Sequence, residues 1–181
     1  MHQVQDFAHP QRVVSLLGIE PGMVVADFGS GSGAYALAAG TALLGSGKVY
    51  AIDVQKDLLR RIANEATHKK IPNIEIVWAD LELPHASKLS DHSVDVVIVS
   101  NLLFQLVDKM PPLREAHRIL KKQGRLAIID WKDSYRGLGP APEDVVTKEA
   151  ASSFATRARF TLSRAFDPGA HHYGLLMKPS H

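Results

Sequence analysis

Short apolar runs alternate with amphipathic segments along most of the chain. Apolar runs of strand length indicate strands buried on both faces, and apolar residues three or four positions apart indicate helices that cover them. The predicted strands are Met23–Phe28, Lys48–Ile52, Asn73–Trp78, Val94–Ser100 and Arg125–Trp131. The predicted helices are Pro10–Leu17, Ala34–Leu44, Gln55–Lys69, Met110–Lys122 and one near Glu143–Arg157, with a polar loop over Ala79–Asp91. This alternation predicts an α/β protein with a mostly parallel sheet.

The chain ends differently, in two strand-like runs with only a short segment between them. These runs are Phe160–Phe166 and Tyr173–Lys178, and Asp167-Pro168-Gly169 lies between them. A segment this short cannot make a parallel crossover, so the pair must be antiparallel. We therefore expect a Rossmann-like, doubly wound, seven-stranded, mostly parallel sheet with a C-terminal antiparallel hairpin. We expect one domain over residues 1–181, in which residues 1–22 form an N-terminal helix and lead-in segment.

Composition narrows the classes of protein. The 181 residues are 45% hydrophobic and 22% charged, which is ordinary for a globular chain. They include no cysteine, which excludes disulfides, zinc–thiolate sites and a cysteine nucleophile. The net charge is +2 and no run of Lys or Arg exceeds two residues, so a solvated surface explains the charge better than a nucleic-acid stripe. With no membrane span and no signal-peptide core in the sequence, we expect a cytoplasmic protein.

A glycine-rich loop follows the first predicted strand. The sequence Asp27-Phe28-Gly29-Ser30-Gly31-Ser32-Gly33 leads into a predicted helix, and such a corner binds anions and nucleotides. The glycine spacing is G-x-G-x-G, but Ala34 also satisfies G-x-G-x-x-A, so spacing does not exclude a dinucleotide. No P-loop motif occurs in the chain.

Asp53 ends the second predicted strand, 20 residues after Gly33. An acid at this place can accept hydrogen bonds from both ribose hydroxyls of an adenosine. Asp is also common in the turn after a strand. The glycine loop before it favours ribose binding.

Five segments in this order resemble the class I S-adenosylmethionine-dependent methyltransferase family. They are VVADFGSGSG, VYAIDV, VWADLELP, VDVVIVSNLLFQL and LREAHRILKKQGRLAIIDW, and the resemblance covers roughly residues 10–178. The final hairpin fits this family and not nicotinamide domains. The run from Asn101 to Trp131 looks most like the branch of ubiquinone/menaquinone-biosynthesis methyltransferases. The usual Pro-Gly-Gly is replaced here by Lys122-Gln123-Gly124, and no substrate-cap insertion is visible.

The resemblance implies S-adenosylmethionine as cofactor and S-adenosylhomocysteine as product. Asp27 would order the glycine loop and reach the cofactor's amino group. Asp53 would take the ribose hydroxyls, with Val54 near the adenine, and Asp80 would accept from the adenine amino group, with Leu81 beside it. The implied cofactor-binding residues are Asp27, Gly29, Ser30, Gly31, Gly33, Asp53, Val54, Asp80, Leu81 and Asn101.

The catalytic candidates lie where predicted strands end. Asn101 follows the fourth strand, and Asp130 and Trp131 end the fifth, on the edge where open α/β sheets bind ligands. Asp130, Trp131 and Asn101 are candidates for substrate contact or proton transfer. A loop hydrogen bond is an equal alternative for Asp130, and core packing is the favoured one for Trp131. No metal site is expected, because no third ligand is identifiable by spacing.

The histidines show no metal-ligand spacing. We expect His117 on a helix surface and the pair His171-His172 solvated at the hairpin. His9, with Phe7, is a candidate for closing over the cofactor.

The acceptor is left open. A small molecule is favoured, and an RNA or protein acceptor is the first alternative. A nicotinamide-dependent oxidoreductase is the second, although no Tyr-x-x-x-Lys is visible, and a non-catalytic cofactor-binding protein is the third. A small core with an open cleft leaves room for a homodimer in which a partner completes the site.

Overall fold

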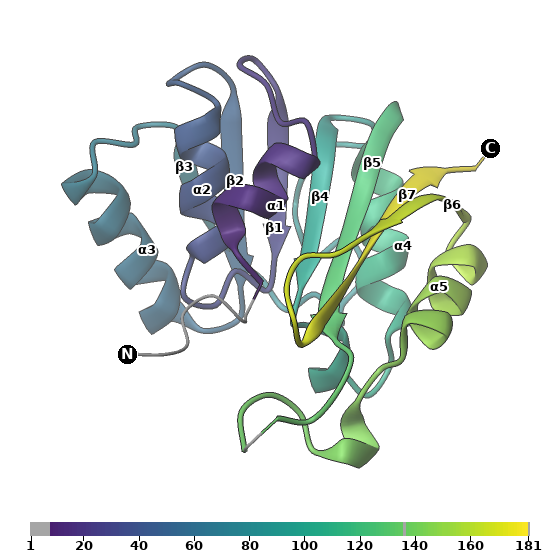
Figure 1. Ribbon diagram of the computed structural model, residues 1–181. Helices are drawn as coiled ribbons and strands as arrows, with labels where there is room; N and C mark the ends of the chain where they lie inside the picture. Colours follow the sequence, from purple (N-terminus) through teal and green to yellow (C-terminus); the bar gives the residue numbers. More distant parts are fainter. Residues whose placement is uncertain (1–7, 136, 181) are drawn as a thin grey trace.

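The computed structural model describes residues 8–135 and 137–180 (Figure 1). The strands are β1 (Val24–Phe28), β2 (Lys48–Asp53), β3 (Ile74–Trp78), β4 (Val94–Ser100), β5 (Leu120–Trp131), β6 (Phe160–Phe166) and β7 (His172–Pro179). The helices are α1 (Pro10–Leu16), α2 (Ala34–Ala42), α3 (Lys56–His68), α4 (Met110–Ile119) and α5 (Lys148–Arg157), with short 3-10 turns η1 (Leu103–Gln105) and η2 (Pro142–Asp144).

The seven strands form one sheet in the order β3-β2-β1-β4-β5-β7-β6. Strands β1 to β5 pair in parallel, whereas β7 is antiparallel to both β5 and β6. The predicted fold class is therefore confirmed. The strand order reverses at β1, which has β2 on one side and β4 on the other, and open α/β sheets bind ligands in the crevice at such a point.

Helices cover both faces of the sheet, because alternate side chains of each strand point to opposite faces (Figure 1). Val25, Ile98 and Ile129 pack with α1, α2 and α3 on one face. Phe28 and Val97 pack with α4 and α5 on the other face. We call these the α2 face and the α4 face. Successive residues of a strand therefore face different layers, and this alternation determines the layer that each site residue faces.

Three predicted boundaries are wrong: the end of α4, the start of β5, which was predicted at Arg125, and the start of α5. Helix α4 ends at Ile119 rather than Lys122, and Gln123-Gly124 lies within β5 instead of stopping the helix. Leu120 is already extended and pairs with Val94 of β4, across an irregularity in the register. Partnering in the sheet therefore overrides the helical pattern of this segment.

The last helix also starts later than predicted. The segment from Glu143 makes the short turn η2, and α5 begins only at Lys148. Thr147 is the N-cap, and its side chain accepts a hydrogen bond from Ala150 N at 3.2 Å. The bounds of the other elements agree with the predictions within about two residues. Among the described residues, no helix has both the length and the apolar character needed to cross a membrane.

Candidate functional site

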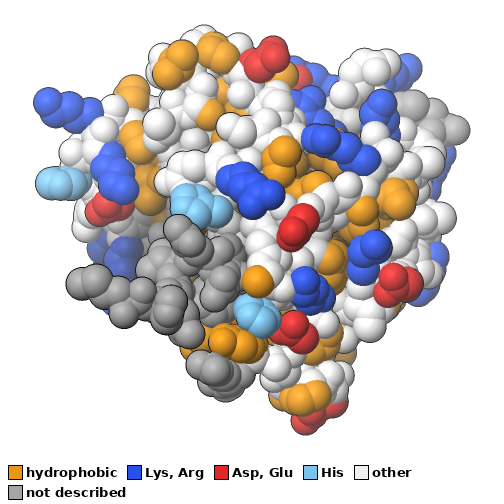
Figure 2. All heavy atoms as spheres, in the orientation of Figure 1, with side chains coloured by type: hydrophobic (Ala, Val, Ile, Leu, Met, Phe, Trp, Pro, Cys, Tyr) orange, Lys and Arg blue, Asp and Glu red, His pale blue; other side chains and the backbone are white. Residues whose placement is uncertain are grey.

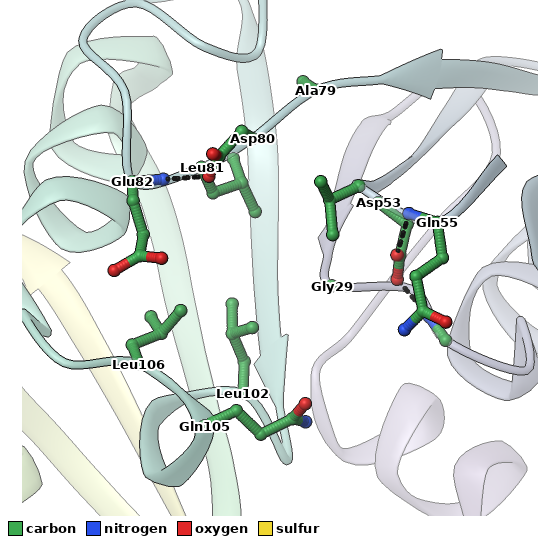
Figure 3. Close-up of a pocket in the computed structure, with 12 residues that line it drawn as sticks. Gly29, Asp53, Gln55, Ala79, Asp80, Leu81, Glu82, Leu102, Gln105 and Leu106 are labelled. Atoms are coloured by element: carbon green, nitrogen blue, oxygen red, sulfur yellow. Dashed lines mark hydrogen bonds between the residues drawn. The ribbon is translucent and has the colours of Figure 1, made fainter.

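A cavity of about 250 Å³ opens where the sheet order reverses, at the carboxyl ends of β1, β2, β3 and β4. Its walls come from four loops that are far apart in the sequence (Figure 3). The lining residues are Gly29, Gly31, Asp53, Val54, Gln55, Ala79, Asp80, Leu81, Glu82, Leu102, Gln105 and Leu106. The structure thus brings together the glycine loop and the acids after the second and third strands.

The glycine loop is held by backbone hydrogen bonds to β2. The amides of Gly29 and Ser30 both donate to the Ile52 carbonyl, at 2.9 and 3.0 Å. Gly33 closes the loop by donating to the Ser30 carbonyl at 2.7 Å, and it is the left-handed N-cap of α2, with φ 81°. A Cβ at Gly33 would lie 2.6 Å from Ile62 Cγ1, so only glycine lets α3 approach this closely.

Asp53 connects the glycine loop to the start of α3. Its Oδ2 accepts from the Gly31 amide at 2.9 Å and its Oδ1 from the Gln55 amide at 2.8 Å, while the residue is 6% exposed. A carboxylate has about four acceptor positions, so these two bonds leave capacity for two more. Asp53 can therefore brace the loop and still accept from two hydroxyl groups in the cavity.

The opposite side of the cavity is apolar with acidic edges (Figure 3). Leu102 and Leu106 point toward Asp80 and the buried Leu81. The Asp80 carboxylate accepts from the Glu82 amide at 3.0 Å through one oxygen. Val54 also lines this space and is 56% exposed. A flat heterocycle with an amino group would meet leucine side chains on one side and a carboxylate at its edge.

Asp27 lies beneath the glycine loop and does not line the cavity. It is 2% exposed and faces the α2 layer, like Val25 two residues before it. Its Oδ2 has no hydrogen-bond partner among the described residues. Burial raises the pKa of Asp27 to about 7, against the lowering effects of the Ala36 backbone and the Ser30 side chain. A cation next to this carboxyl would favour its ionised form.

Asn101 follows β4 in the left-handed conformation, with φ 52°. Its amide donates to the Ile129 carbonyl at 2.8 Å, and its own carbonyl accepts from Gln105 Nε2 at 2.5 Å. Gln105 lines the cavity, so Asn101 is joined to the cavity wall. On its other side, Asn101 Oδ1 lies 3.0 Å from His172 Nε2.

His172 is buried, and the expectation of a solvated residue is wrong. It is 3% exposed because it begins β7 opposite Trp131, and their rings lie 4.3 Å apart. An amide oxygen only accepts, so the contact with Asn101 places the single imidazole proton on Nε2. Burial lowers the pKa of His172 to about 4, and the ring is neutral at pH 7. His172 was not predicted as a site residue, although the predicted hairpin places the start of its second strand at the ligand-binding edge of the sheet.

Asp130 faces the α4 layer, opposite to Asp27. Its neighbours Ile128 and Tyr173 belong to the core on that face. Its two oxygens accept from the amides of Trp131 at 2.9 Å and Leu103 at 3.2 Å, and burial raises its pKa to about 7. These bonds favour the alternative in which Asp130 holds the loop after β4, and its proton-transfer role stays a prediction.

The remaining histidine predictions have mixed outcomes. His171 Nδ1 lies 2.8 Å from Asp133, and its ring stacks on Tyr135 at 3.9 Å. His117 is half-buried, with its ring edge against Phe160. His9 is exposed, and its proposed partner Phe7 lies outside the described residues. No group of three or more His, Asp or Glu that could hold a metal ion is found in the described part of the chain.

Charge on the visible face is mixed. In Figure 2, Lys and Arg side chains are interspersed with acidic and apolar ones and form no continuous stripe. Proteins that bind nucleic acids usually cluster their positive charge. The Lys and Arg side chains on this visible face are not clustered in that way.

Comparison with known proteins gives the same picture as the geometry. A family described as a methyltransferase domain matches residues 19–167. A crystal structure of an S-adenosylmethionine-dependent methyltransferase from Aquifex aeolicus has a similar fold, with a TM-score of 0.82 and 29% identity. The match covers 93% of this chain and 88% of that chain.

Two curated relatives match about two thirds of the chain. The demethylmenaquinone methyltransferase of Alkalihalophilus pseudofirmus is 28% identical over 113 residues, which are 62% of this chain and 46% of the relative. The enzyme of the same name from Staphylococcus aureus is 29% identical over 121 residues, which are 66% of this chain and 48% of the relative. The chain thus spans about half the length of these relatives.

Proposed function

The chain belongs to the family of methyltransferase domains, and we propose on that premise that it transfers a methyl group from S-adenosylmethionine to a small-molecule acceptor. One observation carries the proposal. Asp53 accepts from the Gly31 amide and faces the same cavity as Asp80, so the residues expected for ribose and adenine line one space. The relatives named as demethylmenaquinone methyltransferases support a small acceptor.

The residues present fit this cofactor. The cavity has acceptors for hydroxyl and amino groups, and open space above Gly31, where an added Cβ would meet only the Gly29 carbonyl oxygen at 3.8 Å. The unpartnered Asp27 Oδ2 beneath the loop suits a cationic group. When bound, the cofactor supplies an electrophilic methyl group on a sulfonium.

Methyl transfer demands positioning more than acid–base chemistry. The chain contributes a fixed loop, held by Asp53 and the Ile52 carbonyl, and a fixed amide at Asn101. Asn101 is our candidate for contact with the acceptor side. With its pKa lowered to about 4, His172 is a weak base and serves to hold Asn101. A strongly basic group is needed only for an acceptor that must lose a proton of high pKa.

The test is a calorimetric titration of the purified chain with S-adenosylmethionine and with NAD. We expect micromolar binding of the first, about −8 kcal/mol, and none of the second. Asp53→Ala should weaken binding at least tenfold, because hydrogen bonds to a charged group contribute about 1.5–3 kcal/mol each. Asp57→Ala is the matched control, since the Asp57 side chain is 82% exposed on α3 and, within the described part of the chain, pairs with Arg60 alone. Binding of NAD in place of S-adenosylmethionine would refute the proposal and favour an oxidoreductase.

Three further features belong to the same proposal. The first is a cytoplasmic location of the protein, which is the location expected from the sequence. RNA as acceptor predicts an affinity that falls steeply with salt, and indifference to RNA supports the small molecule. A homodimer that completes the site predicts a dimeric mass by light scattering, and a monomer would remove it.

A further inference from the structure

Trp78 is a large aromatic side chain that the core does not bury. It ends β3, which is an edge strand of the sheet, and it is 53% exposed. Its side chain lines a second cavity, of about 370 Å³, beside the cavity described above. Val54, Ala79 and Asp80 line both cavities. Packing in the core therefore does not account for a tryptophan at this position, which lies directly behind the wall of the candidate site.

The indole nitrogen of this side chain fixes the peptide group that joins Val54 to Gln55. Trp78 Nε1 donates to the Val54 carbonyl at 2.9 Å. The N–H of the same peptide group, that of Gln55, donates to Asp53 Oδ1 at 2.8 Å (Figure 3). A peptide group is planar and trans, so its carbonyl and its N–H point in opposite directions and rotate together. A hydrogen bond that fixes the carbonyl therefore also fixes the N–H that holds the Asp53 carboxylate.

The ends of β2 and β3 bring these groups together. Asp53 and Trp78 are Cα partners in the parallel pairing of the two strands, and the Ala79 amide donates to the Asp53 carbonyl at 3.1 Å. The indole bond to the Val54 carbonyl extends this pairing by one residue beyond the end of β2. Lys56, the first residue of α3, places its ammonium group 3.8 Å from the centre of the Trp78 ring. This cation–π contact holds the indole against the turn.

We propose that Trp78 is a positioning residue for the ribose of the cofactor, and that it acts through the Val54–Gln55 peptide on Asp53. This inference rests on the proposed function, in which the Asp53 carboxylate accepts hydrogen bonds from the ribose hydroxyls. A carboxylate that is already oriented in the free protein binds more tightly than one that must be ordered on binding. Trp78 supplies this orientation from behind the cavity wall and does not itself line the cavity.

The experiment compares two ligands in calorimetric titrations. They are S-adenosylhomocysteine and its 2′,3′-dideoxyribose analogue, which lacks both ribose hydroxyls. The wild type should bind the first at least tenfold more tightly, because the analogue makes no hydrogen bond to the Asp53 carboxylate. Trp78→Phe keeps an aromatic ring but has no N–H. It should weaken S-adenosylhomocysteine about three- to tenfold, through loss of one hydrogen bond, and change binding of the analogue less than about twofold.

A second variant tests the cation above the ring. Lys56→Met keeps a long apolar side chain and removes the charge. It should weaken S-adenosylhomocysteine about two- to threefold, since an exposed cation–π contact is a weak interaction, and should again leave the analogue unchanged. Leu83→Ala is the matched control, because Leu83 lines the same 370 Å³ cavity as Trp78 and is 59% exposed. It should change the affinity for each ligand less than about twofold.

Thermal unfolding without ligand separates positioning from folding. Trp78 is half exposed at the edge of the sheet, so Trp78→Phe should lower the midpoint by less than about 4 °C. A larger fall would assign the indole to folding and overturn the inference. Should Trp78→Phe fail to fold, Lys56→Met still tests the orientation of the ring, and equal affinities of this variant and wild type would overturn the inference.

Three binding outcomes are decisive. Equal weakening of both ligands by Trp78→Phe would overturn the inference, because the indole would then support the whole cavity and not the ribose site. Unchanged affinity of Trp78→Phe for S-adenosylhomocysteine would also overturn it, while leaving the proposed function intact. If the wild type bound neither ligand, the proposed function itself would fail.

Discussion

Replacing Asp27 with asparagine should make the stability of the ligand-free protein less dependent on pH. Burial raises the pKa of the Asp27 carboxyl from 3.8 to about 7 in the folded chain. Between these values the folded state holds a proton that the unfolded state has lost. The stability from this group is therefore fully present below about pH 4 and is lost as pH rises through about 7.

The size of the effect follows from the shift. A change of roughly 3 pKa units at 1.36 kcal/mol per unit gives about 4 kcal/mol between pH 4 and pH 8. Asp130 acts in the same direction over the same range, since burial also raises its pKa to about 7. His172 acts in the opposite direction, because its pKa is lowered to about 4 and its contribution is lost as pH falls from about 6.5 toward 4. Only the difference between wild type and Asp27→Asn isolates Asp27.

The assay is urea unfolding at pH 5, 6, 7 and 8, with the free energy extrapolated to water. The difference in unfolding free energy between Asp27→Asn and wild type should shift steadily in favour of the variant as pH rises. Asp57→Asn, on an exposed side chain, should give a curve parallel to wild type. If the Asp27→Asn curve were also parallel, Asp27 would be ionised throughout, and the account of its buried carboxyl would be wrong.

Other substitutions test the packing around the site. Gly33→Ala should lower the unfolding free energy by roughly 1–3 kcal/mol more than Gly45→Ala, because both have positive φ but only Gly33 would meet Ile62. Equal urea midpoints for the two would refute this. Thr147→Ala should cost about 1 kcal/mol of stability through loss of the α5 cap, and no change would show that the cap bond is not formed in solution. In cofactor binding, calorimetry in buffers of different ionisation enthalpy should show proton release near pH 6 that disappears in Asp27→Asn, since an ammonium favours the ionised carboxyl. Release of equal size in the variant would mean that another group titrates.

Local patterns in the chain were sufficient to predict the sheet and several of the residues that line the cavity at its edge. The run Val94–Ser100 is apolar enough to indicate a buried strand. The segment that follows Phe160–Phe166 is short enough to require that this strand and the next be antiparallel. The glycine loop and Asp53 follow their strands directly, so chain position alone predicts that they meet at one edge. Contacts between residues that are near one another in the sequence determine these features, so the features can be predicted from the sequence.

Tertiary structure decided the features that depend on which residues lie opposite one another. Helix α4 ends at Ile119, earlier than predicted, because Leu120 pairs with β4. No local pattern in the sequence indicates that pairing. His172 was predicted to be solvated, but its strand places it against Trp131 and Asn101, 71 positions away in sequence from the latter. Asp27 and Asp130 are both acids at strand ends, yet they face opposite layers. The alternation of side chains along β1 and β5 within the assembled sheet determines which layer each one faces. Burial arises from the whole fold rather than from neighbours along the chain, and so the raised pKa of Asp27 became visible only in three dimensions.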